Sequence, residues 1–329
     1  MNKLQKREDN SIFSSYFEPL KKDLKSKSYS STIDIAKAIT DYIHNIIDKI
    51  VNATKSINGL HDSIKKDLKL LTSINVMQFT IGNTLKRILH IIDLYRKSDN
   101  DLKSIDNQIF EIKQDIEHLK CHYEKSSDSL IDIALNFIEE GDVILTANYS
   151  DQLYFFLKKA SENLKFTVIV AESYPSLKGE EMAFKLNSIN INSVIISDSS
   201  VFAVMPKITK VMIGTRAVMA NGGLISYNGV YNICLAAKSF NVPVLVLSGS
   251  YKLTPLYPFD HLTFNEQLSP DSIYFCNFKG NLKNITFNAP AYDYVPPEFI
   301  TIYLTDQGDY HPSYIYRLFK ELYSEEDYN

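Results

Sequence analysis

Small hydroxyl residues, amides and glycines follow several apolar runs in the second half of the chain, and these residue types are the ones best suited to chemistry. They occur in the segments TANYS (146–150), GTRAVMANGG (214–223) and SGSYKLTP (248–255). Backbone N–H groups at helix starts bind anions well, so these segments predict a pocket for a phosphate group. The candidate pocket residues are Thr146, Asn148, Thr215, Arg216, Asn221, Gly222 and Lys252.

The same segments also allow a structural interpretation. Ser, Thr, Asn and Gly are the ordinary residues of turns and helix caps. Arg216 and Lys252 have the charge to attract a phosphate, but Arg216 could equally pair with a neighbouring acid. Of these two roles for Arg216, we favour the structural one.

Common catalytic and metal-binding motifs are absent from the sequence. It has no G-x-G-x-x-G, no P-loop and no nucleophile elbow. Cys121, Cys234 and Cys276 are far apart and lack metal-ligand spacing. Cys234 lies in the apolar segment YNICLAA, where we expect a buried thiol. The sequence therefore gives no reason to expect a metal or a cofactor.

The elements that must position these residues fall into two halves. Up to about residue 125, apolar residues recur at spacings of three and four, in runs over 33–50, 85–94 and 105–119. This spacing predicts amphipathic helices whose apolar stripe packs in a core. Ser31 or Thr32 is the expected amino-terminal cap of the first run.

From about Ser129 the periodicity changes to short, apolar, β-branched runs. They begin at Val143, Phe166, Ser193, Lys210, Val242 and Phe299 and alternate with helix-length segments. This alternation predicts a doubly wound, mostly parallel, Rossmann-like α/β domain, in which ligands bind at the carboxyl ends of the strands. We therefore expect a flexible tail (1–10), an α-helical domain (11–125) and an α/β domain (126–329) that ends in an interface segment.

Composition excludes several classes of partner. The 329 residues carry 35 Lys and Arg against 39 Asp and Glu, a formal net charge of −4. This balance gives no reason to expect nucleic acid or an anionic membrane as a partner. The chain has no run of 18 apolar residues and no apolar stretch at its amino terminus, so we expect a soluble protein of the cytosol.

Longer segments carry a resemblance to a known family. KVMIGTRAVMANGGLISYNGVYNICLAAK (210–238) resembles the signature of the regulatory subunits of translation initiation factor 2B. These subunits share their fold with methylthioribose-1-phosphate and ribose-1,5-bisphosphate isomerases. The resemblance extends from about Pro19 to Tyr323. The ending (292–323), with its V-P-P-E and S-Y-I-Y-R-L strings, is more similar to the beta members of the family than to the alpha or delta members.

The resemblance implies that the isomerase chemistry is lost. Where the isomerases have the Cys of a T-H-C-N string, this chain has Asn148. Arg216 stands in place of the Asp of a G-A-D-R string, and Ser226 and Tyr227 replace an Asn-Lys pair that holds substrate. Neither an amide nor a guanidinium exchanges protons near neutral pH. We therefore expect no catalysis, and the candidate pocket would be vestigial.

By resemblance, the chain would be a non-catalytic regulatory subunit of the complex that exchanges guanine nucleotides on initiation factor 2. Its partners would be alpha-like and delta-like sister subunits, gamma-like and epsilon-like catalytic subunits, and factor 2 itself. It would scaffold this complex and help to sense phosphorylation of the factor's alpha subunit, with KKDLKSKS (21–28) and Lys86–Arg87 as candidate basic elements. The alternatives are a sugar-phosphate isomerase and a pseudo-enzyme that senses a phosphosugar or nucleotide.

The carboxyl segment is the expected assembly interface because Tyr and Arg are enriched where proteins bury surface against one another. Some of its tyrosines could instead complete the sheet. The candidate interface residues are Tyr292, Tyr294, Pro296, Pro297, Tyr314, Tyr316 and Arg317.

Overall fold

The computed structural model describes residues 17–26, 29, 31–97, 104–258, 265–269, 284, 286 and 288–324. The chain forms two compact units. The helical unit comprises the chain up to Ser126, Tyr251–Pro255 and the residues from Arg317 onward. The α/β unit comprises Ser127–Ser250 and Leu256–Tyr316.

The helical unit begins with a helical segment over residues 17–26 and continues with four long helices. They are α2 (Thr32–Thr54), α3 (Ile57–Thr72), α4 (Phe79–Lys97) and α5 (Ile105–Asp132). The apolar stripes predicted from the sequence form its core, with Ile43, Ile88 and Ile112 fully buried, joined by Ile64 of α3, which was not singled out in the sequence. Leu94 and Ile105 are exceptions and are exposed: Leu94 points away from the face of α4 that carries Ile88 and Ile92, and Ile105 is the first residue of α5.

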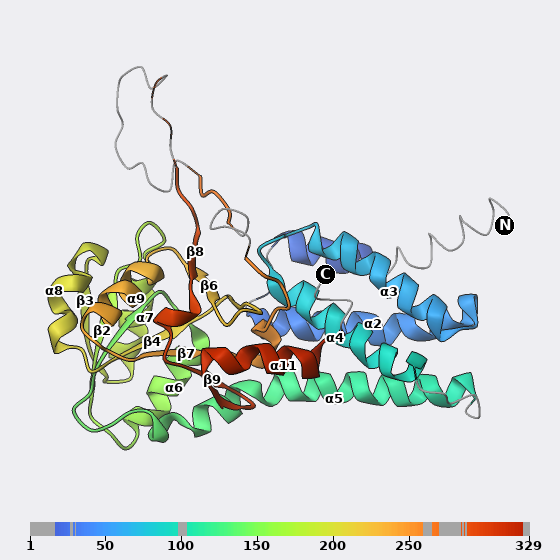
Figure 1. The fold of residues 1–329 in the computed structure, drawn as a ribbon, viewed down its shortest axis with the longest axis horizontal. Helices are drawn as coiled ribbons and strands as arrows, with labels where there is room; N and C mark the ends of the chain where they lie inside the picture. Colours follow the sequence, from blue (N-terminus) through green and yellow to red (C-terminus); the bar gives the residue numbers. More distant parts are fainter. Residues whose placement is uncertain are drawn as a thin grey trace. The chain divides into compact units, whose positions relative to one another are not determined.

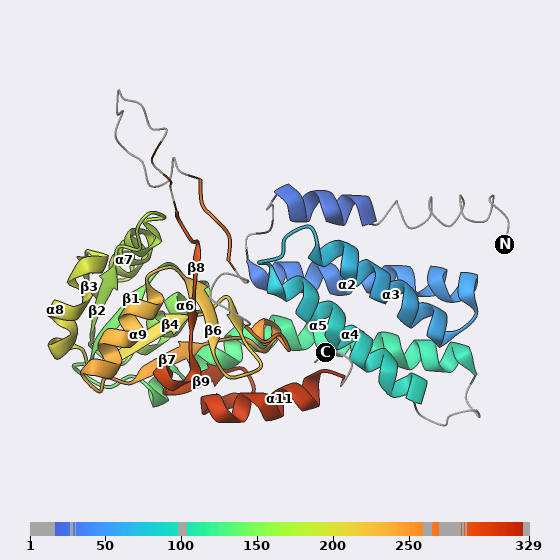
Figure 2. The ribbon, with the colours of Figure 1, turned by 45° about the horizontal axis from the view of Figure 1, so that its top comes forward.

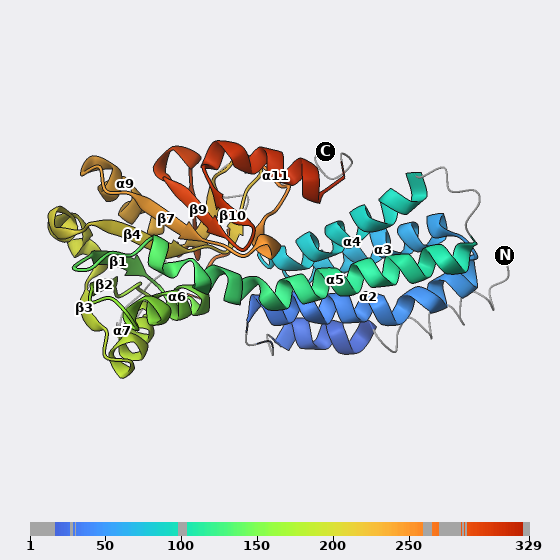
Figure 3. The ribbon, with the colours of Figure 1, turned by 90° about the horizontal axis from the view of Figure 1, so that it is seen from below.

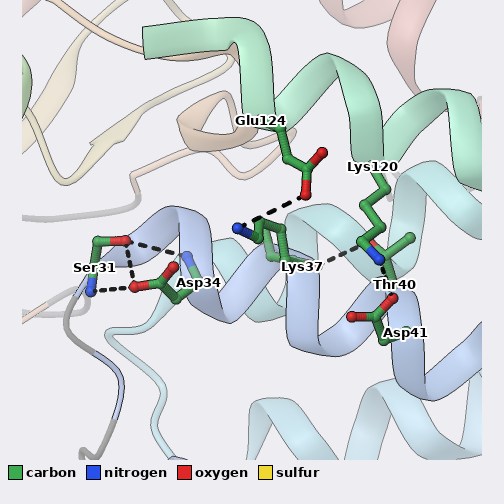
Figure 4. Close-up of polar contacts among 8 residues, drawn as sticks. Ser31, Asp34, Lys37, Thr40, Asp41, Lys120 and Glu124 are labelled. Atoms are coloured by element: carbon green, nitrogen blue, oxygen red, sulfur yellow. Dashed lines mark hydrogen bonds and ion pairs between the residues drawn. The ribbon is translucent and has the colours of Figure 1, made fainter.

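Polar contacts fix the start of α2 and its alignment with α5. Ser31 caps α2 and forms a capping box with Asp34, so two backbone N–H groups gain acceptors (Figure 4). Further along α2, Asp41 pairs with Lys120 of α5 at 2.6 Å. The predicted cap at Ser31 is therefore confirmed.

The α/β unit is built on a seven-stranded sheet in the order β10-β9-β7-β4-β1-β2-β3. All neighbouring pairs are parallel except β9 and β10. Taken in chain order, the six parallel strands have the 3-2-1-4-5-6 arrangement of the doubly wound fold. The strands are β1 (Val143–Ala147), β2 (Thr167–Ala171), β3 (Asn192–Ile196), β4 (Lys210–Gly214), β7 (Val244–Leu247), β9 (Ile302–Thr305) and β10 (Gly308–Tyr310).

Helices cover both faces of this sheet. Because crossovers between parallel strands are right-handed, α6 (Asp151–Ser161) and α7 (Lys178–Ser188) cover one face. The other face is covered by α8 (Val201–Val204) and α9 (Val230–Ser239), as Figure 3 shows. The branched residues of β1, β2, β4 and β7 are buried between these layers.

A second, antiparallel sheet has the order β5-β6-β8 and lies beside α9 (Figure 2). Its strands are β5 (Ala217–Val218), β6 (Leu224–Tyr227) and β8 (Tyr292–Val295). We did not predict it, because two- to four-residue strands are too short to show a period-two pattern.

The predicted fold class is confirmed. Each of the six apolar runs contains one parallel strand, and the three helix-length segments between them contain α6, α7 and α9. No helix in the described ranges is long and apolar enough to cross a membrane. The predicted domain limits remain a proposal, and the predicted tail (1–10) lies outside the described residues.

Candidate functional site at the carboxyl ends of the strands

The strand order locates the candidate site at the carboxyl ends of β1 and β4. These strands are adjacent and in parallel register, with Ile144 opposite Lys210. From β1 the chain adds strands toward β3 at one edge of the sheet, and from β4 it adds strands toward β10 at the other edge. The order of strands therefore reverses between β1 and β4, and ligands of open α/β sheets bind at such a switch point. Of the seven candidate pocket residues, Thr146 and Asn148 lie at the end of β1, and Thr215 and Arg216 follow β4.

The end of β1 is buried, polar and uncharged. Asn148 is 5% exposed and has a left-handed backbone, with φ of 59°. Its backbone N–H donates to Ser173 Oγ at 2.7 Å, and that hydroxyl donates to the Ala171 carbonyl. Among the described residues, neither Thr146 Oγ1 nor Asn148 Nδ2 has a hydrogen-bond partner. Two buried polar atoms are thus available for a small polar molecule or water.

The loop after β4 is fixed by its own side chains. The buried Thr215 hydroxyl lies 2.9 Å from the carbonyls of both Ala217 and Ile225. The Arg216 guanidinium lies over the Tyr292 ring, 5.5 Å from its centroid. Burial raises the pKa of Tyr292, while the nearby Arg216 charge partly opposes this shift. Both candidate residues thus have structural contacts.

The Asn221–Gly222 turn connects β5 to β6 and contacts the carboxyl part of the unit. Asn221 accepts from the Gly223 N–H and donates to the Tyr294 hydroxyl at 2.7 Å. Gly222 has φ of 83°, and its carbonyl accepts from the buried Tyr303 hydroxyl. A Cβ on Gly222 would lie 2.4 Å from the Pro312 carbonyl oxygen. Glycine is therefore required here for both backbone angle and space.

The start of α9 carries an internal carboxylate. Asp293 Oδ2, on β8, accepts from the backbone N–H groups of Gly229 and Tyr231 at 2.8 and 3.0 Å. A helix amino terminus is an anion-binding position, and here the chain's own side chain occupies it. Asp293 and Ser173 were missed from the sequence because their partners lie 64 and 25 residues away.

Two further residues singled out in the sequence have surroundings of their own. Lys252 belongs to the helical unit, where it is buried with its ammonium 5.8 Å from the centre of the Tyr251 ring. Cys234 is fully buried, as predicted, and burial raises the pKa of its thiol to about 12. It is therefore protonated and unreactive near neutral pH. Cys276 lies outside the described residues.

The candidate interface residues divide by exposure. Tyr292 is buried, and Tyr294, Pro296 and Pro297 are half-buried. Tyr314 and Tyr316 are 38% and 47% exposed, and the Arg317 side chain is 69% exposed. Tyr316 and Arg317 lie on the amphipathic helix α11 (Ile315–Leu322). The segment thus combines tyrosines that complete the fold with a short exposed stretch.

The site's chemistry is that of neutral hydrogen-bonding groups on a Rossmann-like scaffold. Amides and hydroxyls hold the loops, and no group of three or more His, Cys, Asp or Glu side chains in the described ranges could hold a metal. Fold and site therefore define a doubly wound α/β protein whose switch point has a neutral hydroxyl and amide at the end of β1 and an arginine stacked on a tyrosine after β4.

The chain belongs to the initiation factor 2 subunit family, which it matches over residues 24–312. It is similar to translation initiation factor eIF2B subunit beta of Dictyostelium discoideum, with 31% identity over 366 residues, covering 92% of this chain and 94% of that protein. Among solved structures, it is similar to a chain of the tetrameric eIF2B beta2–delta2 complex from C. thermophilum. That chain is 25% identical with a TM-score of 0.72, and the likeness covers 93% of this chain and 94% of the other.

An enzyme is among its more distant relatives. The ribose 1,5-bisphosphate isomerase of Pyrococcus furiosus is 28% identical over 280 residues, which cover 84% of each protein. The resemblance to beta-type subunits and the kinship with an isomerase, both predicted from the sequence, are confirmed.

Proposed function

We propose that this chain is a non-catalytic, beta-type regulatory subunit of the complex that exchanges guanine nucleotides on translation initiation factor 2. In this role it scaffolds the complex and helps to sense phosphorylation of the factor's alpha subunit. The observation that carries the proposal is the likeness to eIF2B subunit beta over nearly the whole of both chains.

The residues at the switch point support the view that the subunit is not itself a catalyst. Moving a proton between adjacent sugar carbons requires an acid–base group within hydrogen-bonding reach of them. Asn148 offers an amide at the end of β1, and Arg216 lies over Tyr292. Neither group titrates near neutral pH, so proton transfer by these two residues is excluded on chemical grounds.

For assembly, we propose as contact residues only those of the carboxyl segment that are exposed, which are Tyr314, Tyr316 and Arg317. Tyr314 and Tyr316 offer aromatic surface, and the exposed Arg317 pairs with the i,i+4 carboxylate of Glu321 at 3.7 Å. Such an exposed ion pair is weak, so a partner's carboxylate can replace it at little cost. We propose that these three residues contact a delta-like sister subunit.

Co-purification tests the assembly role. The tagged chain is expressed with alpha-, delta-, gamma- and epsilon-like subunits, and bound partners are quantified for Tyr316→Ala, Arg317→Ala and a control. Lys159→Ala is the control, because Lys159 is exposed on α6 and pairs only locally, with Glu162. We expect the carboxyl variants to lose the delta-like sister by tenfold or more and the control to retain it. Undiminished recovery would refute the contact, and purification without any sister subunit would refute the function.

Of the two basic elements expected to sense phosphorylation, only the first is supported by its exposure in the helical unit. Arg87 is buried, with its guanidinium 5.5 Å from the centre of the Tyr123 ring, so it does not provide a solvent-facing basic element. The lysines of residues 21–25 are on the first helical segment, where Lys21 pairs with Glu18 at 3.5 Å. We propose this segment as the basic element. Replacing Lys21, Lys22 and Lys25 with Gln should weaken preference for phosphorylated over unmodified factor 2, measured as a ratio of affinities.

A ligand-sensing pseudo-enzyme is the second candidate function. It is favoured by the buried Thr146 hydroxyl and Asn148 amide nitrogen, which have no hydrogen-bond partner in the described part of the chain and could bind a small polar molecule. Because Asp293 already occupies the start of α9, that helix offers no position for a phosphate. Thermal unfolding with millimolar sugar phosphates and nucleotides is the test, since a ligand specific to the native state raises its stability. A shift that Asn148→Leu abolishes would support this candidate, and no shift with any of them would reject it.

A further inference from the structure

One edge of the seven-stranded sheet is unlike the rest of the α/β unit. β3 pairs with β2 at five successive positions and is the outermost strand on that side (Figure 3). Within the described part of the chain, no strand pairs with its other side. Its outer backbone groups therefore form a template onto which another strand can add.

Apolar side chains are exposed on both faces of this edge. Ser193 Oγ bonds to the Ala183 carbonyl of α7, so Ser193 and Ile195 share the face that α7 covers, and Val194 lies on the opposite face. Val194 and Ile195 are each 44% exposed. On α7, Phe184 is 68% exposed. A buried parallel strand normally has both faces covered, and β3 does not.

The edge also lacks the usual protection against pairing. No charged residue and no proline occurs between Lys185 and Asp198, where the sequence is LNSININSVIIS (186–197). Soluble proteins commonly place lysines, prolines or bulges on edge strands to prevent association. Asp198 does not serve this purpose, because its carboxylate accepts from the backbone N–H groups of Ser173 and Tyr174.

The order of residue types along the edge identifies the strand that fits it. β3 ends at Ile196 and the extended Ser197 follows it, so residues 193–197 read S-V-I-I-S, a pattern that is symmetric about Ile195. We propose that β3 binds β3 of a second copy of this chain, antiparallel and centred on Ile195. The occupant is thus a strand that the chain itself supplies.

In this register, apolar residues lie opposite apolar residues and serines lie opposite serines. Ile195 lies opposite Ile195 of the copy, Val194 opposite Ile196, and Ser193 opposite Ser197. Directly opposed side chains share a face, so the α7 helices of the two copies lie on the same side of the joined sheet. No like charges are opposed, and the two-fold axis closes the assembly at two copies.

This dimer is expected to be weak and concentration-dependent, since a single strand pair buries little surface. Its residues are distinct from Tyr314, Tyr316 and Arg317, so it does not rest on the proposed function.

Sedimentation equilibrium of the purified chain tests the proposal. Ile195→Lys introduces two facing ammonium groups at the centre of the strand pair and should weaken self-association at least tenfold. The matched control is Leu235→Lys, which alters an apolar side chain of α9 that is 39% exposed, away from β3. We expect its dimerisation constant to equal that of the unaltered chain. A chain that remains monomeric at all concentrations, or a dimer unaffected by Ile195→Lys, would overturn the proposal.

Disulfide trapping tests the register. Under mild oxidation, Ile195→Cys should form a covalent dimer, because this residue lies opposite its own copy. Asn192→Cys should not, because in this register residue 192 lies three positions from the two-fold axis and does not face its own copy. Equal trapping at both positions would refute the register. Dimerisation that Tyr316→Ala abolishes and Ile195→Lys leaves intact would overturn the edge proposal and assign self-association to the carboxyl segment.

Discussion

The amino and carboxyl ends of the strands in the seven-stranded sheet differ in the charged contacts that they make. At the amino ends of β1 and β4, Asp142 and Lys210 form a buried ion pair at 2.7 Å, with side chains 7% and 14% exposed. At the carboxyl ends, where ligands of such folds bind, the candidate pocket presents a hydroxyl and an amide, on Thr146 and Asn148. This ion pair is thus on the side of the sheet away from the expected site.

Carboxylates do occur at the carboxyl end, but they hold loops. Asp198 accepts from two backbone N–H groups after β2, and Asp293 accepts from two at the start of α9. Asp306, after β9, accepts from the backbone N–H and hydroxyl of Ser250. The comparison teaches that the acidic groups at the carboxyl end stabilise the scaffold by holding loops, whereas the acidic group at the amino end forms an ion pair.

Removing the cation at the amino end is expected to have the largest effect. Lys210→Met leaves the Asp142 carboxylate buried without its ion-pair partner, which should lower the free energy of unfolding by about 3–5 kcal/mol. Urea unfolding followed by circular dichroism measures the change. The control, Lys159→Met, removes an exposed pair with Glu162 and should cost less than about 1 kcal/mol. A small effect of Lys210→Met would contradict the contrast between the two ends.

The same pair predicts a pH dependence. Burial raises the pKa of the Asp142 carboxyl, but Lys210, the Thr209 hydroxyl and the Glu139 backbone N–H outweigh it, so the net pKa is lowered. A carboxyl with a lowered folded pKa contributes stability above its unfolded pKa, about 3.9, and loses it as the pH falls through the folded value. Unfolding free energy should therefore fall below about pH 4, and less steeply in Lys210→Met. If the unfolding free energy fell equally steeply with pH in the unaltered chain and in Lys210→Met, Asp142 would be excluded as the cause of the acid destabilisation.

At the carboxyl end, Gly222→Ala should have the next largest effect. The new Cβ combines a left-handed backbone with a close approach to the Pro312 carbonyl, at an expected cost of about 2–4 kcal/mol. Gly141→Ala separates the two causes, because Gly141 has φ of 85° with no atom within 4 Å of the added Cβ. It should cost only the backbone strain, about 1–2 kcal/mol. Equal unfolding midpoints for the two variants would show that the Pro312 contact is unimportant.

Asp293→Ala tests whether the carboxylate at the start of α9 is structural. Two backbone N–H groups lose their acceptor, as in a lost helix cap, so we expect destabilisation of about 1–2 kcal/mol in urea unfolding. Asp293→Asn keeps an acceptor oxygen and should recover most of this loss. If Asp293→Asn were as damaging as Asp293→Ala, the negative charge itself would be essential.

The smallest effect is expected from Thr146→Val. Its buried hydroxyl has no partner among the described residues, and replacing it with a methyl group leaves no hydrogen bond broken. The change in unfolding free energy should lie within about 0.5 kcal/mol of zero, or be stabilising. A loss above about 1 kcal/mol would indicate that the hydroxyl binds an ordered water or ligand.

Much of the fold was predictable because its signals are local. The run from Ile33 to Ile50 repeats every three to four residues over more than four turns, and it forms α2 with the cap at Ser31. VILTA, from Val143, is apolar on both faces and forms a buried strand. The short strands β5 and β6 have no such signal, since their pairing depends on the Asn221–Gly222 turn and on β8.

The candidate site was predictable only in outline. Asn148 and Thr215 were located from the strand ends that precede them, which are local features. Their contacts were not, because Ser173 comes from the loop after β2. Nor could spacing reveal that Lys252 belongs to the helical unit, which depends on tertiary packing. Whether these residues bind a ligand remains a proposal.

The Asp293 cap also constrains the order of events during synthesis. The amide groups at the start of α9 leave the ribosome first, and the carboxylate that receives them follows 64 residues later for Gly229. β8, which carries it, also completes the sheet with β6. At synthesis rates of about 5–20 residues per second, α9 therefore waits several seconds for its cap. During that interval the N–H groups of Gly229 and Tyr231 have no carboxylate to accept from them, so the start of α9 and the second sheet are completed in the same step.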